Sequence, residues 1–88
     1  MELKIGAVVQ SVRGRDEGFF AVVRAEGKFA YLANGKQRPL EKPKKKNIRH
    51  LKDTGLALDL EKIQTNRRLK TALRTATEEE GRSWQKKM

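Results

Sequence analysis

Positive charge is concentrated in one stretch of the chain, residues 35–52. This stretch carries eight Lys or Arg side chains and one carboxylate, in a chain of 88 residues whose formal net charge is +10. A charge kept only for solubility would be spread more evenly. Like charges packed together repel one another, and a polyanion relieves that repulsion by releasing its counterions when it binds. The stretch therefore predicts a surface that binds phosphate groups.

Residues suited to catalysis are scarce by comparison. The chain has no Cys, and its one histidine, His50, cannot form a metal site or a catalytic triad alone. The sequence shows no paired carboxylates in an apolar setting, no phosphate-binding P-loop and no metal-ligand spacing. We therefore expect a protein that is not an enzyme and that uses no cofactor, metal or small-molecule substrate.

The elements that position the basic residues are expected to be short strands separated by turns. The expected strands cover residues 3–12, 19–23, 29–32, 37–40 and 48–51. Glu26-Gly27 is typical of a tight turn, and Asn34-Gly35 is a strong hairpin signal because both residues tolerate positive φ. Short strands joined by tight turns, in so few residues, favour a small closed or half-closed barrel.

The aromatic residues of this region are divided between the core and the surface. A barrel this small needs large side chains to fill it, so Phe20 and Phe29 are predicted to be core residues. In a regular strand Tyr31 shares the inner face with Phe29, since alternate residues point to the same side. Phe19 is one step out of phase with Phe20 and faces outward. It is the better candidate for stacking on a nucleobase.

The C-terminal part of the chain has a helical period. Apolar residues at 69, 72, 73 and 76 form the stripe of an amphipathic helix. Thr65 or Asn66 is suited to cap its N-terminus, and Gly81 to end it. Residues 82–88 are expected to be disordered. The stretch 56–60 is compatible with a linker, a strand or a helical turn.

A loop in the N-terminal half carries a resemblance to a known family. The sequence IGAVVQSVRGRDEGFFAVV resembles the KOW motif of RNA-binding SH3-like barrels, in which a basic loop joins two strands. Gly14, Arg15, Asp16 and Gly18 match the loop positions, and Glu17 stands where a Lys is common. Gly18 allows the backbone a conformation, or a close approach to a phosphate, that a Cβ would block. Arg13 and Arg15 would project from the turn.

The basic segment KPKKKNIRHL, followed by Thr54, adds to this resemblance. It is similar to the segment that closes the barrel in archaeal and eukaryotic large-subunit ribosomal proteins of the fourteen-e and twenty-seven-e kind, and in short bacterial KOW-domain RNA-binding proteins. The resemblance covers roughly residues 3–54. It implies a mainly β fold, a small SH3-like barrel of about five strands with a C-terminal helical appendage. The expected divisions are a barrel over 1–54, a linker and short helix over 55–81, and a tail over 82–88.

Charge and resemblance together predict a protein that binds structured RNA, with ribosomal RNA of the large subunit as the favoured target and ribosomal proteins as further partners. The expected RNA-binding residues are Arg13, Arg15, Gly18, Lys36, Arg38, Lys42, Lys44, Lys45, Lys46, Arg49, His50 and Lys52. A cytoplasmic protein is expected, because no apolar run approaches the roughly 20 residues of a membrane span. The resemblance implies that it is associated with the ribosome. Two alternatives stay open. One is a protein-interaction KOW module of the transcription or translation machinery, and the other is a nucleoid-type protein that binds duplex DNA.

Overall fold

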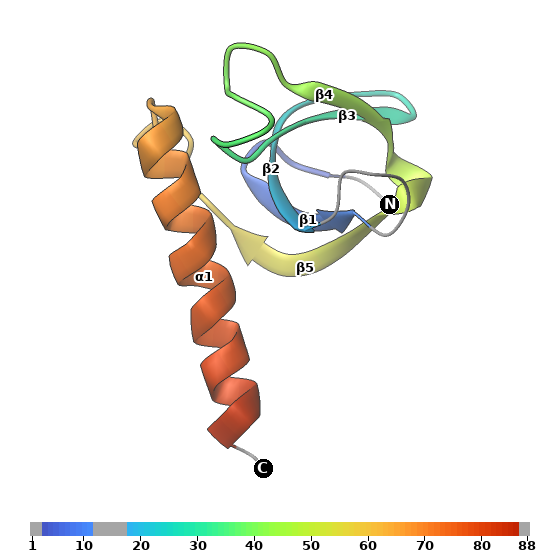
Figure 1. Cartoon of the computed structure of the whole chain (residues 1–88). Helices are drawn as coiled ribbons and strands as arrows, with labels where there is room; N and C mark the ends of the chain where they lie inside the picture. Colours follow the sequence, from blue (N-terminus) through green and yellow to red (C-terminus); the bar gives the residue numbers. More distant parts are fainter. Residues whose placement is uncertain (1–2, 12–17, 87–88) are drawn as a thin grey trace.

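The computed structural model describes residues 3–11 and 18–86, with side chains described as far as Thr77. The described residues form five strands, a short 3-10 helix and one long α-helix (Figure 1). The strands are β1 (Ala7–Ser11), β2 (Gly18–Glu26), β3 (Phe29–Ala33), β4 (Lys44–Asn47) and β5 (Leu51–Ala57). The helices are η1 (Ile48–His50), between β4 and β5, and α1 (Asn66–Lys86). The protein is thus mainly β with a C-terminal helix, as the sequence predicts.

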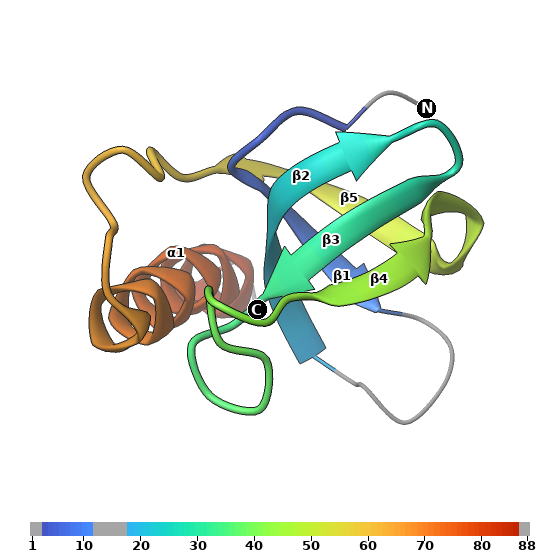
Figure 2. The same ribbon diagram turned by 90° about the horizontal axis from the view of Figure 1, so that it is seen from above.

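All five strands belong to one antiparallel sheet with the order β4-β3-β2-β1-β5. The sheet is not closed, since β4 and β5 form its two edges. It is nevertheless strongly curved, as the two views of the ribbon show (Figures 1 and 2). The register shifts between Val22 and Arg24 where β2 pairs with β3, and between Ala7 and Val9 where β1 pairs with β5. Irregularities of this kind bend a strand and increase its twist.

The inner, concave side of the sheet holds one hydrophobic core. Val9, Phe20, Val22 and Leu32 are almost completely buried there, and Leu51 at the start of β5 joins them. The prediction that Phe20 is a core residue is confirmed. A buried side chain of this size contributes about 1.5–3 kcal/mol relative to an exposed one, so these residues account for much of the stability of so small a sheet.

The outer side of the sheet is covered in part by α1. Val8, Ala21 and Ala33 from the strands pack with Leu69 and Leu73 from the helix in a second core. The central strands are therefore buried on both faces at this end of the sheet. This explains why β2 contains a continuous apolar run rather than an alternating pattern.

The helix forms as its apolar stripe predicts but is longer than expected. Thr65 caps its N-terminus, because its hydroxyl accepts a hydrogen bond of 3.2 Å from the backbone N–H of Arg68. The helix continues through Gly81 to Lys86, so the predicted end at Gly81 is wrong and residues 82–86 belong to the helix. A single internal glycine costs a helix only about 1 kcal/mol. In the described part of the chain, no helix is long and apolar enough to cross a membrane.

Two of the expected strands are not where the sequence placed them. Residues 37–40 form an irregular loop, and the fourth strand is the lysine-rich β4. Residues 48–50 form η1, and the fifth strand runs from Leu51 to Ala57, past the expected boundary at residue 54.

The physical reason for the irregular loop is a set of side chain–backbone hydrogen bonds at Asn34. Its Oδ1 accepts bonds of 3.0 Å from the N–H groups of Lys36 and Arg38. Its own N–H donates to the Arg38 carbonyl at 2.8 Å. Backbone groups satisfied in this local way are removed from strand pairing. The expected turn at Asn34-Gly35 is therefore present, with Gly35 at φ +77°, but no strand follows it directly.

Candidate nucleic-acid interface

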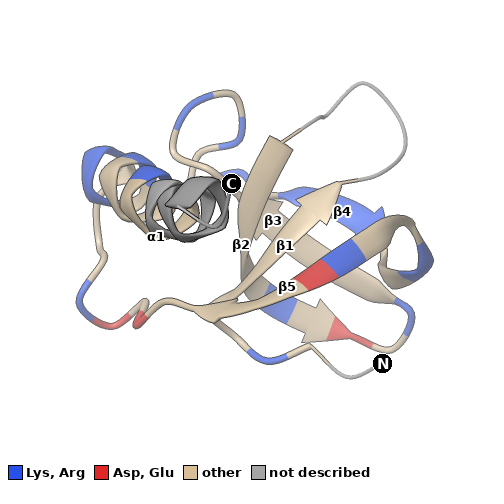
Figure 3. Ribbon diagram, turned by 90° about the horizontal axis from the view of Figure 1, so that it is seen from below, with Lys and Arg blue, Asp and Glu red and all other residues tan. Residues whose placement is uncertain are grey.

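The lysine cluster of the sequence forms an edge strand. Lys44, Lys45 and Lys46 are consecutive in β4, which pairs with β3 on one side only. Lys44 and Lys45 are exposed. Among the described residues, neither of them forms an ion pair with a carboxylate. The strand is part of a basic border along this side of the molecule (Figure 3). Two full positive charges are thus held on a rigid element and left available to a partner.

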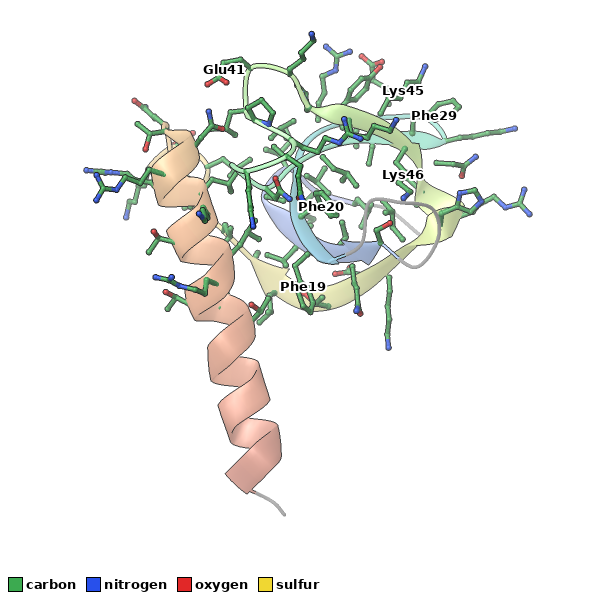
Figure 4. The ribbon with its side chains drawn as sticks, viewed as in Figure 1. Phe19, Phe20, Phe29, Glu41, Lys45 and Lys46 are labelled. Atoms are coloured by element: carbon green, nitrogen blue, oxygen red, sulfur yellow. The ribbon has the colours of Figure 1, made fainter. Side chains whose placement is uncertain are left out.

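Lys45 lies against an aromatic ring. Its Nζ is 4.4 Å from the centroid of Phe29, and the two residues come from the adjacent strands β4 and β3 (Figure 4). A second pair lies beside it on the same face, where the Arg24 guanidinium is 4.5 Å from the centroid of Tyr31. Arg24 also forms an ion pair of 3.0 Å with Glu26.

The position of Phe29 corrects the sequence prediction. Phe29 was expected in the core but is 37% exposed. Tyr31 shares its face, as strand alternation predicts, but that face is the outer one. The inward positions of β3 belong to Ala30 and Leu32, which are 0% and 1% exposed. Phe19 is exposed as predicted, at 36%, and lies on a different part of the sheet from Phe29 (Figure 4).

Lys46 differs from Lys45. By strand alternation it lies on the opposite side of β4 from Lys45 and on the same side as Lys44. It is half-buried, and its Nζ donates a hydrogen bond of 2.5 Å to the hydroxyl of Ser11 at the end of β1. Ser11 itself is buried. The bond joins β4 to a strand that it does not pair with, across the concave side of the sheet. Lys46 therefore has a structural role in the fold, and its contact with a phosphate stays a prediction.

The loop before β4 is attached to the start of α1 by Asn66. The Asn66 side chain accepts a 2.7 Å hydrogen bond from the backbone N–H of Leu40, and its Nδ2 donates to both carboxylate oxygens of Glu41 at 2.9 and 3.0 Å. Gly35 approaches the same turn so closely that a Cβ there would clash with the Asn66 carbonyl oxygen. These contacts hold loop 34–43 beside the N-terminus of the helix.

This attachment joins two basic segments that are about thirty positions apart in the sequence. Lys36, Arg38 and Lys42 belong to the loop, and Arg67 and Arg68 belong to the helical turn that follows Asn66. The two arginines were not predicted as site residues. The sequence did contain an indication of such a role. Cations at a helix N-terminus oppose the macrodipole and lower helix stability, so two arginines at this position are more easily explained by binding than by folding. The carboxylate of Glu41, held beside the same turn, partly offsets that cost.

The remaining predicted residues follow β4 in the chain. Arg49 is exposed on η1, His50 is half-buried beside it, and Lys52 is exposed on β5. The short helix is fixed by Asn47, whose Oδ1 accepts a 2.9 Å bond from the Arg49 N–H, and by a 2.8 Å bond from the Ile48 N–H to the Lys28 carbonyl. The basic residues from 36 to 52 are thus distributed along the loop beside the helix, the edge strand β4, η1 and the start of β5.

The GRDEG loop contributes only its last residue to the described structure. Gly18 begins β2 with φ +111°, a conformation in the region that favours glycine, as its role in the predicted loop requires. Arg13 and Arg15 lie outside the described residues.

No group of three His, Asp or Glu that could hold a metal ion is found in the described part of the chain. No protein-family model and no curated protein matches the chain at a significant level.

Proposed function

We propose that the protein binds structured RNA through the basic side of its sheet, as a ribosomal or ribosome-associated protein of the cytoplasm. The binding residues in this proposal are the basic residues of loop 34–43, β4, η1 and the start of β5, together with Arg13, Arg15 and Gly18. The fold is then a small SH3-like barrel, and the strand order β4-β3-β2-β1-β5 and the strong curvature of the sheet support that description.

The observation that carries the proposal is the exposure of Lys44 and Lys45 on a rigid strand. Neither forms an ion pair with a carboxylate of the described residues. Exposed cations of this kind can contact the phosphates of a nucleic acid, and such contacts position a protein on the nucleic acid without reading its sequence. We therefore expect tight binding at low salt, a steep salt dependence and weak sequence preference.

RNA is favoured over other polyanions by the resemblance of the GRDEG loop and the segment KPKKKNIRHL to KOW-domain proteins. The same resemblance favours ribosomal RNA of the large subunit. Gly18, which matches the last position of the KOW loop motif, has φ +111°, in the region that favours glycine.

A second explanation for lysines on β4 must be separated from RNA binding. Edge strands in natural proteins commonly carry Lys, because a charge prevents the edge from pairing with another chain. The double variant Lys44→Glu/Lys45→Glu separates the two roles. It keeps a charged edge but reverses the sign of the charge. RNA binding predicts a soluble monomer that no longer binds RNA, whereas pure edge protection predicts a monomer whose RNA affinity equals that of the wild type.

The proposal is tested by competition and by crosslinking. A labelled RNA hairpin should be displaced by unlabelled structured RNA at physiological salt, and only at much higher concentration by duplex DNA of the same sequence. Equal competition would indicate a nucleoid-type DNA-binding protein. Crosslinking in cells, followed by sequencing of the attached RNA, should give reads concentrated in large-subunit ribosomal RNA. Partners that survive nuclease treatment, with no crosslinked RNA, would indicate a protein-interaction module.

A further inference from the structure

The outer face of β2, β3 and β4 carries a feature that phosphate binding alone does not require. Beyond the end covered by α1, this face presents Phe29 and Tyr31, and each ring has a cation over it. Phe29 is 37% exposed, which is a large apolar ring left in contact with water. Stacking platforms for single-stranded nucleic acids combine these two elements, an aromatic face and an adjacent positive charge.

We propose that Phe29 and Lys45 form a binding site for one unpaired nucleotide of the RNA, with the base stacked on the Phe29 ring and the phosphate bound by the Lys45 ammonium. The inference rests on the proposed RNA binding and extends it. It states that the target combines a helix, bound through phosphates, with an unpaired base in a loop or bulge next to it. Such bases are the part of a folded RNA that aromatic side chains can reach.

The two aromatic–cation pairs are not equivalent, and their contacts select Phe29. Tyr31 is half-buried, and the arginine over its ring is held in place by the 3.0 Å ion pair with Glu26. Lys45 is exposed and forms no ion pair with any described carboxylate. It is therefore the cation that is free to move.

The geometry allows one nucleotide to engage both groups. The ammonium of Lys45 is 4.4 Å from the centre of the Phe29 ring and is carried by a flexible four-carbon stem. When a base takes the ring face, the ammonium moves aside toward the phosphate of the same nucleotide. A cation–π contact, worth about as much as an exposed ion pair, is then exchanged for a contact with a full negative charge.

The test compares two leucine variants of equally exposed phenylalanines. Phe29→Leu removes the ring of the proposed site, and Phe19→Leu is the matched control, because Phe19 is 36% exposed and no described cation lies over its ring. The probe is an RNA hairpin with 2-aminopurine at one unpaired loop position, together with a fully paired duplex RNA of equal length. Binding is measured at several salt concentrations.

For Phe29→Leu we expect an affinity for the hairpin about 5- to 150-fold lower than that of the wild type, the range that stacking of one base provides. The affinity for the duplex and the slope of log K against log[salt] should not change. The wild-type protein should quench the 2-aminopurine fluorescence, Phe29→Leu should not, and Phe29→Trp should restore both quenching and affinity. Phe19→Leu should behave as the wild type.

Two negative results are distinguishable. If the wild type binds the hairpin and Phe29→Leu binds it equally well with equal quenching, the stacking site is refuted while RNA binding stands. The same holds if Phe19→Leu is the variant that loses affinity. If the wild-type protein binds neither the hairpin nor the duplex at low salt, the proposed function itself is refuted.

Discussion

The charges on β4 give a quantitative prediction for the double variant Lys44→Gln/Lys45→Gln. Both side chains are exposed on an edge strand and form no ion pair with a described carboxylate, so their replacement by a polar neutral residue should leave the fold unchanged. If each lysine neutralises one phosphate, the variant lacks two of the contacts that release counterions. Its affinity for structured RNA should then depend less steeply on salt.

The size of the effect follows from counterion release. Each neutralised phosphate contributes about 0.7–0.9 to the slope of log K against log[salt]. The loss of two contacts should therefore reduce the magnitude of the slope by about 1.4–1.8. Between about 50 mM and about 200 mM salt, the affinity of the wild type should fall about tenfold more than that of the variant.

Fluorescence anisotropy with a labelled RNA hairpin, measured at five or more salt concentrations, provides the slope. Arg74→Gln on the exposed side of α1 removes one positive charge away from β4 and is the matched control. Lys46→Gln is the informative third variant. Because Lys46 donates a hydrogen bond to the buried Ser11, its loss should lower the free energy of unfolding by about 0.5–1.5 kcal/mol and change the slope less than Lys44→Gln or Lys45→Gln.

The reasoning is refuted if the double variant has the slope of the wild type. It is also refuted if Lys46→Gln flattens the slope as much as either of the other lysines while leaving the stability unchanged. In that case Lys46 would contact phosphate, and its hydrogen bond to Ser11 would not form in solution.

Three further predictions concern the structure that holds the interface. Leu69→Ala, which opens a cavity between α1 and the sheet, should lower the free energy of unfolding in urea by about 2–4 kcal/mol; a loss below about 1 kcal/mol would mean that the helix is not packed on the sheet. Gly35→Ala should be clearly more destabilising than Gly27→Ala in thermal melts, because both have positive φ but only the first Cβ would meet backbone. Asn66→Ala should increase hydrogen exchange and proteolysis within loop 34–43, which it holds, and equal protection in both proteins would contradict that role.

Much of the fold could be predicted from local patterns. The apolar run 19–23 and the returning run 29–32 gave β2 and β3, and the Glu26-Gly27 turn joins them with Gly27 at φ +56°. The apolar stripe that includes Leu69 and Leu73 predicted the position of the helix and which of its residues are buried against the sheet. These features depend on periodicity and turn chemistry, which residues close in the sequence determine by themselves.

The errors arose where contacts between distant residues decide the outcome. Strand alternation placed Phe29 and Tyr31 on one face, but only the pairing with β2 and β4 determined that this face is the outer one. A run of lysines has no strand pattern, and β4 exists because it pairs with β3. Hydrogen bonds to a neighbouring strand offset the conformational entropy that such a segment loses when it becomes ordered.

The sequence by itself determined the basic segment 36–52, the mainly β character and the amphipathic helix. Only the tertiary structure assigned different roles to consecutive lysines, since Lys45 lies on an exposed aromatic ring while Lys46 points across the concave side to Ser11. It also placed Asn66, at the start of the helix, beside the loop that carries Lys36. The physical reason is the same in each case: charge is a property of the residue, whereas burial and the partner of that charge depend on which distant segments the chain brings together.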